Sequence, residues 1–348
     1  MKSTAEHPEN RPIKLFIPIY FDDSIYPSAG GGSQRKLTYW QTITVLCASI
    51  RRASIPQLDI LISANESPPP EISAVLENFD VAFVRPDFSF RPPTGLYPAF
   101  SGAFYLFDTM RHCRSLSREN IFVFLDPDCL VMDNFEHLRQ LTDRHSIVAY
   151  DLGLQEDEKV NGCSRTDLLA FLRLMASNDV DAPPRYFGGE LLIVQGGQID
   201  NLCEVVDQIW NVNLANFAAG KVALKTEEHV LSAALAKLEE HVGHGNEIIK
   251  RMWTRPSFRN VSFDDRKFSI WHLPAEKRHA FQRLYVLVRN DVDHLTGLGD
   301  KEFRDLVSKL VRLKLSFVER PFYGLYSLLK KSIGRLAGLA PVHGAKIQ

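Results

Sequence analysis

One apolar run constrains this chain more than any other stretch. Residues 121–125 read Ile-Phe-Val-Phe-Leu, and the run stops at Asp126, Pro127 and Asp128. A short run rich in β-branched and aromatic residues is typical of a strand buried on both faces of a parallel sheet. The two carboxylates therefore lie at the carboxyl end of a strand, the edge where open α/β sheets bind ligands. Two hard oxygen donors one residue apart suit Mg²⁺ or Mn²⁺ bridging to substrate phosphates.

The Asp-x-Asp pattern alone is a weak signal. It recurs at residues 179–181 and 291–293, where no hydrophobic run precedes it. Solvated acids in a strand-end turn explain Asp126 and Asp128 as well as a metal site does. The meaning of the pair depends on what the rest of the chain supplies.

Apolar strands alternate with helical patterns along most of the chain. Expected strands cover residues 14–21, 58–64, 81–84, 146–150, 186–194 and 268–273, and expected helices cover 35–52, 70–79, 98–113, 135–141, 167–177, 199–210 and a stretch after Thr226. Such alternation is typical of βαβ units and a mostly parallel sheet. We expect an α/β domain over residues 13–295, after a disordered N-terminus at residues 1–12.

Composition narrows the class of protein. A content of 45% hydrophobic and 24% charged residues is ordinary for a soluble globular chain, and a net charge of −1 argues against binding to nucleic acid. Five scattered cysteines without a CxxC pair indicate a reducing compartment. Residues 1–12 lack the apolar core of a signal peptide, so we expect a cytoplasmic protein.

The C-terminal part differs from the rest in charge. Residues 301–340 hold nine Lys or Arg and three acids, a net charge of +6, so the remainder carries −7. We therefore expect a basic amphipathic helical tail over residues 296–348. Its apolar face comprises Leu325, Leu328, Leu329, Ile333 and Leu336, opposite Lys330, Lys331 and Arg335. This pattern favours peripheral binding to an anionic membrane surface, and a helix packed on the protein's own core is the alternative.

Two glycines open the strand expected at residues 186–194. Gly188 and Gly189 permit close approach of the backbone to a ligand. Glu190 follows them and is either a site carboxylate or the first solvent-facing residue of the strand. Of these two, we favour the solvent-facing position.

Later segments supply further candidates. Thr226 is a plausible N-cap that places Glu227 and Glu228 in the first turn of a helix, where the helix dipole favours negative charge. Acids are also common there without any function. His272 lies in the last expected strand and Lys277 follows it; a lone strand histidine is more often a satisfied core residue than a ligand.

Four segments, taken in order, resemble the GT-A nucleotide-sugar glycosyltransferases. Residues 22–26 resemble the Asp-Asp-Asn-Tyr donor-base turn of the family that includes glycogenin and bacterial lipopolysaccharide galactosyltransferases, and residues 124–128 resemble its Tyr-Leu-Asp-x-Asp. Residues 186–189 are similar to its Tyr-Phe-Asn-Ala-Gly and to the Phe-Gly-Gly of the blood-group transferases. Residues 227–232 stand where these families have Asp-Gln-Asp-x-Leu-Asn and Asp-Glu-Ser-His-Leu-Asn.

The resemblance implies a GT-A fold, with a Rossmann-like, mixed but mostly parallel sheet flanked by helices, and a metal-dependent transferase. It implies a Mn²⁺ or Mg²⁺ site at Asp126, Asp128 and His272, catalytic carboxylates at Glu228 and Glu227, and retention of anomeric configuration. The implied donor-binding residues are Asp22, Ser24, Tyr26, Asp126, Gly188, Gly189 and Lys277. A UDP-sugar donor, and a glycan or lipid-linked acceptor of cell-surface polysaccharide synthesis, are the expected substrates.

The chain also departs from the family pattern. Residues 271–277 lack the glycine and the Pro-Trp of the family's His-x-x-Gly-x-x-Lys-Pro-Trp segment, and the lysine comes one residue early. The roles of His272 and Lys277 therefore stay open. Gly188 replaces an asparagine, which can alter sugar recognition.

Other classes of protein remain possible at this point. A haloacid-dehalogenase-type phosphatase has a similar Asp-x-Asp strand end, and Asp264 and Asp265 would be its late acidic pair. Two observations argue against a phosphatase. Leu130 stands where the phosphatase motif has Thr or Val, and Asp126 and Asp128 lie over a hundred residues into the chain instead of near its start. A sugar nucleotidyltransferase is a weaker rival. A catalytically silent sugar-binding protein on the same fold is the alternative that is not an enzyme.

Overall fold

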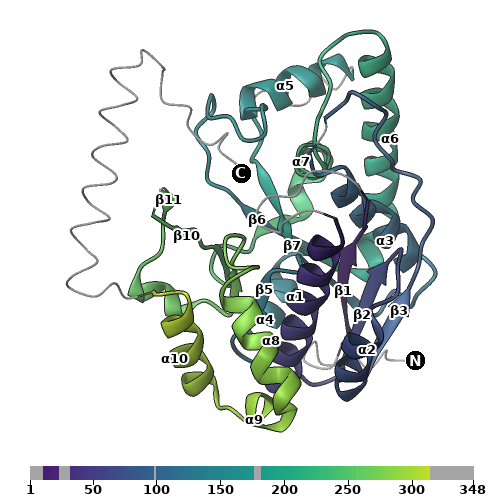
Figure 1. Cartoon of the computed structure of the whole chain (residues 1–348). Coiled ribbons are helices and arrows are strands. Elements are labelled where there is room, and N and C mark those ends of the chain that lie inside the picture. Colours follow the sequence, from purple (N-terminus) through teal and green to yellow (C-terminus); the bar gives the residue numbers. More distant parts are fainter. Residues whose placement is uncertain (1–10, 23–31, 98, 176–181, 257, 314–348) are drawn as a thin grey trace, which may run out of the picture.

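The computed structural model describes residues 11–22, 32–97, 99–175, 182–256 and 258–313. These residues form a seven-stranded sheet in the order β3-β2-β1-β4-β7-β6-β8 and a three-stranded sheet in the order β5-β12-β9 (Figure 1). The large sheet consists of β1 Ile13–Ile19, β2 Leu58–Ala64, β3 Val81–Val84, β4 Ile121–Leu125, β6 Ile147–Asp151, β7 Phe187–Gln195 and β8 Val242–His244. The small sheet consists of β5 Cys129–Val131, β9 Ile249–Arg251 and β12 Ile270–His272, and β10 Thr254–Arg255 pairs with β11 Phe258–Arg259.

Helices cover both faces of the large sheet. One core contains apolar residues of α1 Gly32–Arg52, α2 Pro70–Leu76, α4 Glu136–Arg144, α8 Ala280–Asn290, α9 Val292–Thr296 and α10 Asp300–Leu310. The other contains those of α3 Tyr105–Cys113, α5 Arg165–Leu174, α6 Ile199–Ala218 and α7 Glu227–Lys237. Short 3-10 turns lie at Glu77–Phe79, Ser101–Phe104, Gly196–Gln198, Glu239–His241 and Phe263–Lys267.

Strand β4 shows why the sheet is buried on both sides. Ile121, Val123 and Leu125 belong to the core that contains α1 and α8, whereas Phe122 and Phe124 belong to the core that contains α3 and α6. Successive strand residues point to opposite faces, so a strand without polar residues needs cover on both. Polar chemistry is thereby left to the strand ends.

The prediction of a mixed, mostly parallel sheet flanked by helices is confirmed. Strand β1 runs parallel to β2 and to β4, β2 to β3, and β6 to β8. Strand β7, however, is antiparallel to both β4 and β6. Strand β4 therefore has one parallel and one antiparallel neighbour, as a mixed sheet has.

Element boundaries follow the sequence pattern closely in the first half. The strands predicted at residues 58–64 and 81–84 match β2 and β3 residue for residue. The single helix expected over 98–113 is instead a 3-10 turn followed by α3, and Phe100, which directly precedes the turn, lies in the left-handed backbone region. The helix expected over 199–210 continues to Ala218 because its apolar spacing persists into that stretch.

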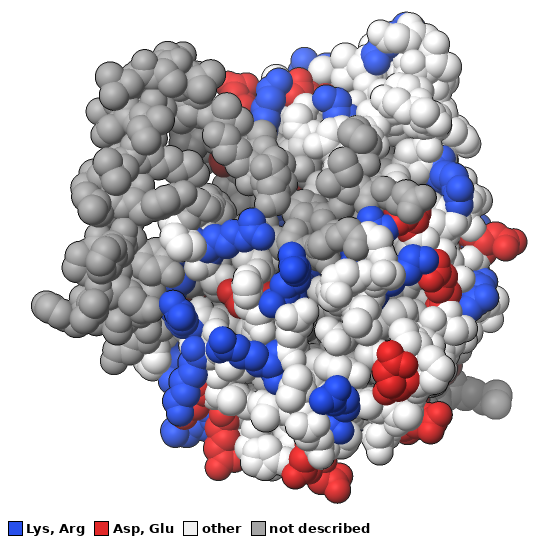
Figure 2. All heavy atoms as spheres, viewed as in Figure 1, with Lys and Arg blue, Asp and Glu red and all other residues white. Residues whose placement is uncertain are grey.

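The expected tail begins with a helix that packs on the domain. Phe303 and Val307 of α10 are buried in the core that also contains α1 and α8. Figure 2 shows Lys and Arg side chains gathered on the face where Figure 1 places α8 and α10. The predicted apolar face at residues 325–336 lies outside the described residues, so membrane binding stays a prediction. Among the described residues, no helix combines the length and apolarity needed to cross a bilayer.

The turn between β7 and α6 offers a clean test of this packing. The Gly196 N–H donates to Asn120 O at 2.8 Å, and a Cβ at Gly196 would lie 2.5 Å from the backbone oxygen of Arg118. Backbone cannot yield as a flexible side chain does, so Gly196→Ala should lower the free energy of unfolding by about 1–3 kcal/mol in urea denaturation.

The adjacent glycine provides the matched control. A Cβ at Gly197 meets nothing within 4 Å. Gly197→Ala should therefore change the free energy of unfolding by no more than about 0.5 kcal/mol. Equal effects of the two substitutions would contradict the described packing of this turn.

Candidate active site

Two sheets meet at the carboxyl end of β4. Asp126 follows this strand directly, and Asp128 precedes β5. Strand β5 pairs antiparallel with β12, which places Cys129 opposite His272, and the Leu273 N–H donates to the Asp128 backbone oxygen at 2.9 Å. Backbone pairing therefore brings His272 to a carboxylate pair that lies well over a hundred residues earlier in the chain.

The side chains of Asp126, Asp128 and His272 form a compact group. His272 Nε2 lies 3.4 Å from Asp128 Oδ2 and 3.6 Å from Asp126 Oδ2. One potential ligand atom of each residue lies within 4.8 Å of the others. Asp128 and His272 are buried, while the Asp126 side chain is 40% exposed. The group is thus held in place by its two buried members, and solvent reaches it at Asp126.

Lys277 adds a cation to the same group. Its Nζ donates to the Asp128 carboxylate and lies 5.7 Å from the centroid of the Tyr39 ring. Burial opposes ionisation of Asp128, but Lys277 and His272 outweigh it and hold the pKa of Asp128 far below its usual value. Asp128 is therefore an ionised carboxylate at neutral pH.

The residues present fit a divalent cation. Two carboxylates and an imidazole are ligands that Mn²⁺ and Mg²⁺ sites use, and Asp126 gives access from solvent. Burial, followed by the charges of Asp128 and Glu190, raises the pKa of Asp126, although His272 opposes the shift. A bound cation would favour the ionised form of Asp126, which burial and the neighbouring carboxylates oppose.

Glu190 is not solvent-facing, and the favoured sequence interpretation was wrong. Its side chain has no exposed surface, and its carboxylate pairs with Arg251. Oε1 also lies 3.3 Å from His272 Nδ1. The interpretation failed because β7 lies inside the sheet, with a core on each face, so a residue at its start is covered as well.

Arg251 is the main residue that the sequence did not reveal. It ends β9, which pairs parallel with β12 so that Arg251 stands opposite His272. Its guanidinium Nε and Nη2 each donate to one oxygen of Glu190 at 2.6 Å. The available signal was indirect: a region with so many carboxylates needs buried cations, and basic residues on short late strands are candidates.

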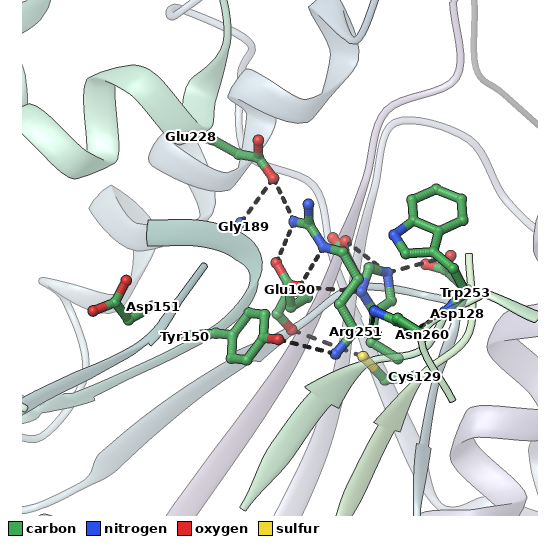
Figure 3. Close-up of polar contacts among 12 residues, drawn as sticks. Asp128, Cys129, Tyr150, Asp151, Gly189, Glu190, Glu228, Arg251, Trp253 and Asn260 are labelled. Atoms are coloured by element: carbon green, nitrogen blue, oxygen red, sulfur yellow. Dashed lines mark hydrogen bonds and ion pairs between the residues drawn. The ribbon is translucent and has the colours of Figure 1, made fainter. Parts of the chain in front are cut away.

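The two glutamates of α7 lie at its first turn and differ in their surroundings. Glu228 Oε1 accepts from Arg251 Nη2 at 2.6 Å and from the Gly189 N–H at 3.4 Å (Figure 3). Glu228 Oε2 accepts from Asn161 Nδ2 at 3.4 Å. Glu227 Oε2 is buried without a hydrogen-bond partner among the described residues. Burial, then Glu228 and Asp126, raise the pKa of Glu227 well above its usual value.

The other predicted donor-binding residues are brought only partly to this cluster. Gly189 contacts Glu228, but the open side of Gly188 faces the Glu190–Arg251 pair rather than free space. Asp22 follows β1 at the same edge of the sheet and accepts a hydrogen bond from Ser101 Oγ at 2.9 Å. Ser24 and Tyr26 lie outside the described residues.

The late acidic pair proposed for a phosphatase lies elsewhere. Asp265 pairs with Lys250 at 2.8 Å and accepts from the Ser262 N–H at 2.7 Å. Lys250 and Arg251 are consecutive in β9, so their side chains point to opposite faces of the strand. Because Arg251 faces Glu190, Asp265 lies on the other side and does not supply a second acidic pair beside Asp126.

In overall structure the chain is similar to glycosyltransferases. It matches the galactosyltransferase LgtC, solved in complex with donor and acceptor sugar analogs, at 13% identity and a TM-score of 0.46, covering 89% of this chain and 99% of that chain. It matches mouse xyloside xylosyltransferase 1 at 13% identity and a TM-score of 0.45, covering 75% of this chain and 96% of that chain. It matches the bifunctional glycosyltransferase WbbM at 14% identity and a TM-score of 0.44, covering 78% of this chain and 46% of that chain.

No protein-family model and no curated protein sequence matches the chain. The likeness to solved structures is remote in both sequence and geometry. What the cluster can do chemically therefore has to be inferred from its own side chains.

Helix α7, which carries Glu227 and Glu228, begins at a histidine-capped turn. His229 Nδ1 accepts from the backbone N–H groups of Lys225 and Thr226 at 3.1 and 3.3 Å, and His229 Nε2 pairs with Val160 O. Thr226 is the N-cap residue, as predicted, but its hydroxyl has no hydrogen-bond partner among the described residues. Burial, with Lys225 adding to it, lowers the pKa of His229 to about 4.

A pH dependence of stability follows. Because the folded chain keeps His229 neutral while the unfolded chain protonates it below about pH 6.5, the stabilisation is complete above that pH and is lost as pH falls toward 4. The loss should be on the order of 3 kcal/mol at most. Urea denaturation across this range should show a flatter profile for His229→Gln, with exposed His241→Gln as control. An unchanged profile in His229→Gln would contradict the described cap.

Proposed function

We propose that this protein is a metal-dependent glycosyltransferase that moves a sugar from a nucleotide-diphosphate donor to a glycan or lipid-linked acceptor. The observation that carries the proposal is the cluster of Asp126, Asp128 and His272, with Lys277 beside it, at the carboxyl edge of the sheet. A catalytic carboxylate, Glu228, is linked to that cluster by a continuous set of ion pairs. Metal ligands and a fixed carboxylate together suit cleavage of a sugar–diphosphate bond.

The first part of the mechanism concerns the leaving group. Departure of a nucleoside diphosphate builds negative charge on its phosphate oxygens, and a divalent cation held by Asp126, Asp128 and His272 would supply the charge that stabilises it. Lys277 contributes a further positive charge at the same place. Since Asp128, His272 and Lys277 are all buried, these charges act where water screens them little.

The second part concerns the sugar. Glu228 Oε1 is engaged by Arg251 and Gly189, which leaves Oε2, held weakly by Asn161, as the oxygen free to face an anomeric carbon. The ion pair with Arg251 lowers the nucleophilicity of the Glu228 carboxylate, and a carboxylate that forms no bond can still stabilise an oxocarbenium-like centre by its charge. We therefore assign Glu228 the electrostatic role, with retention of configuration, and propose that Glu227 contacts the sugar.

The donor and acceptor are proposed from the resemblance to GT-A enzymes. A UDP carrier, and base or ribose contacts from Asp22, Ser24 and Tyr26, follow from the resemblance of residues 22–26 to the donor-base turn of GT-A enzymes. Gly189 lies beside Glu228 at the place proposed for the sugar. Mn²⁺ or Mg²⁺ is the proposed metal.

The direct test is binding and turnover of a panel of nucleotide sugars with Mn²⁺ or Mg²⁺. Asp126→Asn keeps the shape of the most exposed ligand and removes its charge. It should weaken metal-dependent donor binding at least tenfold and lower kcat, measured at saturating donor, by about 10²–10³-fold, as loss of one preorganised charged group does. Isothermal titration calorimetry and a nucleotide-release assay report the two effects.

Asp264→Asn is the matched control, because Asp264 is an exposed aspartate outside the cluster. It should behave as the parent does. Failure of every nucleotide sugar to bind, with release of phosphate from small phosphomonoesters instead, would replace the transferase by the phosphatase. Donor binding without turnover of any acceptor or of water would favour the catalytically silent alternative.

A further inference from the structure

Glu190 joins two groups that the proposed mechanism treats separately. One oxygen, Oε1, receives the Nε–H of Arg251 at 2.6 Å and lies 3.3 Å from His272 Nδ1. The other, Oε2, receives the Nη2–H of Arg251 at 2.6 Å. The carboxylate is fully buried, so these contacts fix it from both sides.

Arg251 extends the contact to the catalytic carboxylate. The same Nη2 that donates to Glu190 also donates to Glu228 Oε1 at 2.6 Å. Its backbone N–H donates to the Tyr150 hydroxyl at 3.3 Å, and its strand is paired with β12. A continuous path therefore runs from the metal ligand His272 through Glu190 and Arg251 to Glu228.

The charges along this path support one another. Burial opposes ionisation of Glu190, yet Arg251 and His272 bring its pKa down to about 2. Burial also opposes the charge on Arg251, but Glu190 and Glu228 hold its pKa well above the usual value. Both groups stay charged at neutral pH, so the path is a set of fixed charge-assisted hydrogen bonds.

Gly188 shows that space is reserved for this ion pair. A Cβ at Gly188 would lie 2.0 Å from Glu190 Oε2 and 2.7 Å from Arg251 Nη2. Any side chain at this position would displace one of the two groups. The absence of a side chain at Gly188 thus leaves room for the ion pair. This accounts for glycine at the position where the glycogenin-like transferases have asparagine.

We propose that Glu190 and Arg251 are positioning residues that hold His272 and Glu228 in one shared geometry. Glu190 accepts the Nδ1–H of His272, which leaves Nε2 directed at Asp126 and Asp128 as a ligand atom. Arg251 fixes Glu228 Oε1 and thereby leaves Oε2 for the sugar. The inference rests on the proposed function for Glu228, but its metal part can be tested without any donor.

The test separates the two ends of the path with Mn²⁺ binding and with kinetics. Glu190→Gln removes the charge that orients His272, so Mn²⁺ affinity in the absence of donor should fall about 10–100-fold in an electron paramagnetic resonance titration. Arg251→Lys keeps a positive charge but loses the planar fork. It should lower kcat at least tenfold, with KM for the donor within about threefold of the parent, and should weaken Mn²⁺ binding less than Glu190→Gln does. The reason is that the Arg251 side chain contacts Glu228 directly but reaches His272 only through Glu190.

A comparable ion pair elsewhere provides the matched control. Arg304 and Asp133 form a half-buried pair at 2.7 Å outside the cluster. Arg304→Lys and Asp133→Asn should alter thermal stability without changing Mn²⁺ affinity or kcat. If Glu190→Gln does not fold, Gly188→Ala replaces it, because the added Cβ displaces the same carboxylate, and the same loss of Mn²⁺ affinity is expected.

Each outcome separates this inference from the proposed function. Parent-like Mn²⁺ affinity in Glu190→Gln, or losses no greater than those of the control pair, would overturn the positioning role even if sugar transfer is observed. Conversely, a parent that binds Mn²⁺ but uses no nucleotide sugar would defeat the proposed function, while weaker Mn²⁺ binding in Glu190→Gln would still support the link from Glu190 to His272. A parent that binds no Mn²⁺ would overturn both.

Discussion

The buried carboxylate of Glu190 is the constraint on which this site depends. Antiparallel pairing of β4 with β7 places Leu125 opposite Leu191, and the Asp126 N–H donates to the Glu190 backbone oxygen at 3.2 Å. A charge buried in this way costs several kcal/mol unless it is paired and hydrogen-bonded. Arg251 and His272 provide that pairing, and both residues belong to strands of the small sheet.

The small sheet therefore has a role beyond closing the core. Its strands place Cys129, His272 and Arg251 in one row, since Cys129 stands opposite His272 and His272 stands opposite Arg251. One end of this row adjoins Asp128, and the other reaches Glu228 on α7. The carboxylates between β4 and β5, His272 of β12 and Glu228 of α7 thus share one rigid support built of backbone pairing and ion pairs.

The sequence predicted the parts of this arrangement that depend on local pattern. Hydrophobic runs predict buried strands such as residues 121–125, and the carboxylates follow these runs directly. The order of the four segments that resemble GT-A enzymes pointed to His272 and Glu228. Glu190 was misplaced because alternation along a strand does not tell which strands lie inside a sheet. Arg251 was missed because a three-residue strand with a single arginine has no signature of its own, and its partners come from other strands and from α7. Its function exists only in the assembled fold.

The proposed function requires that Asp126, Asp128 and His272 hold a divalent cation that meets the diphosphate of a sugar donor. Anomalous scattering at the manganese edge, from crystals grown with Mn²⁺ and UDP, would locate this cation. We expect one manganese peak bounded by these three side chains, with the diphosphate as a further ligand and Lys277 beside it. A bound nucleotide with no manganese at this position, or with manganese held by other residues, would contradict it.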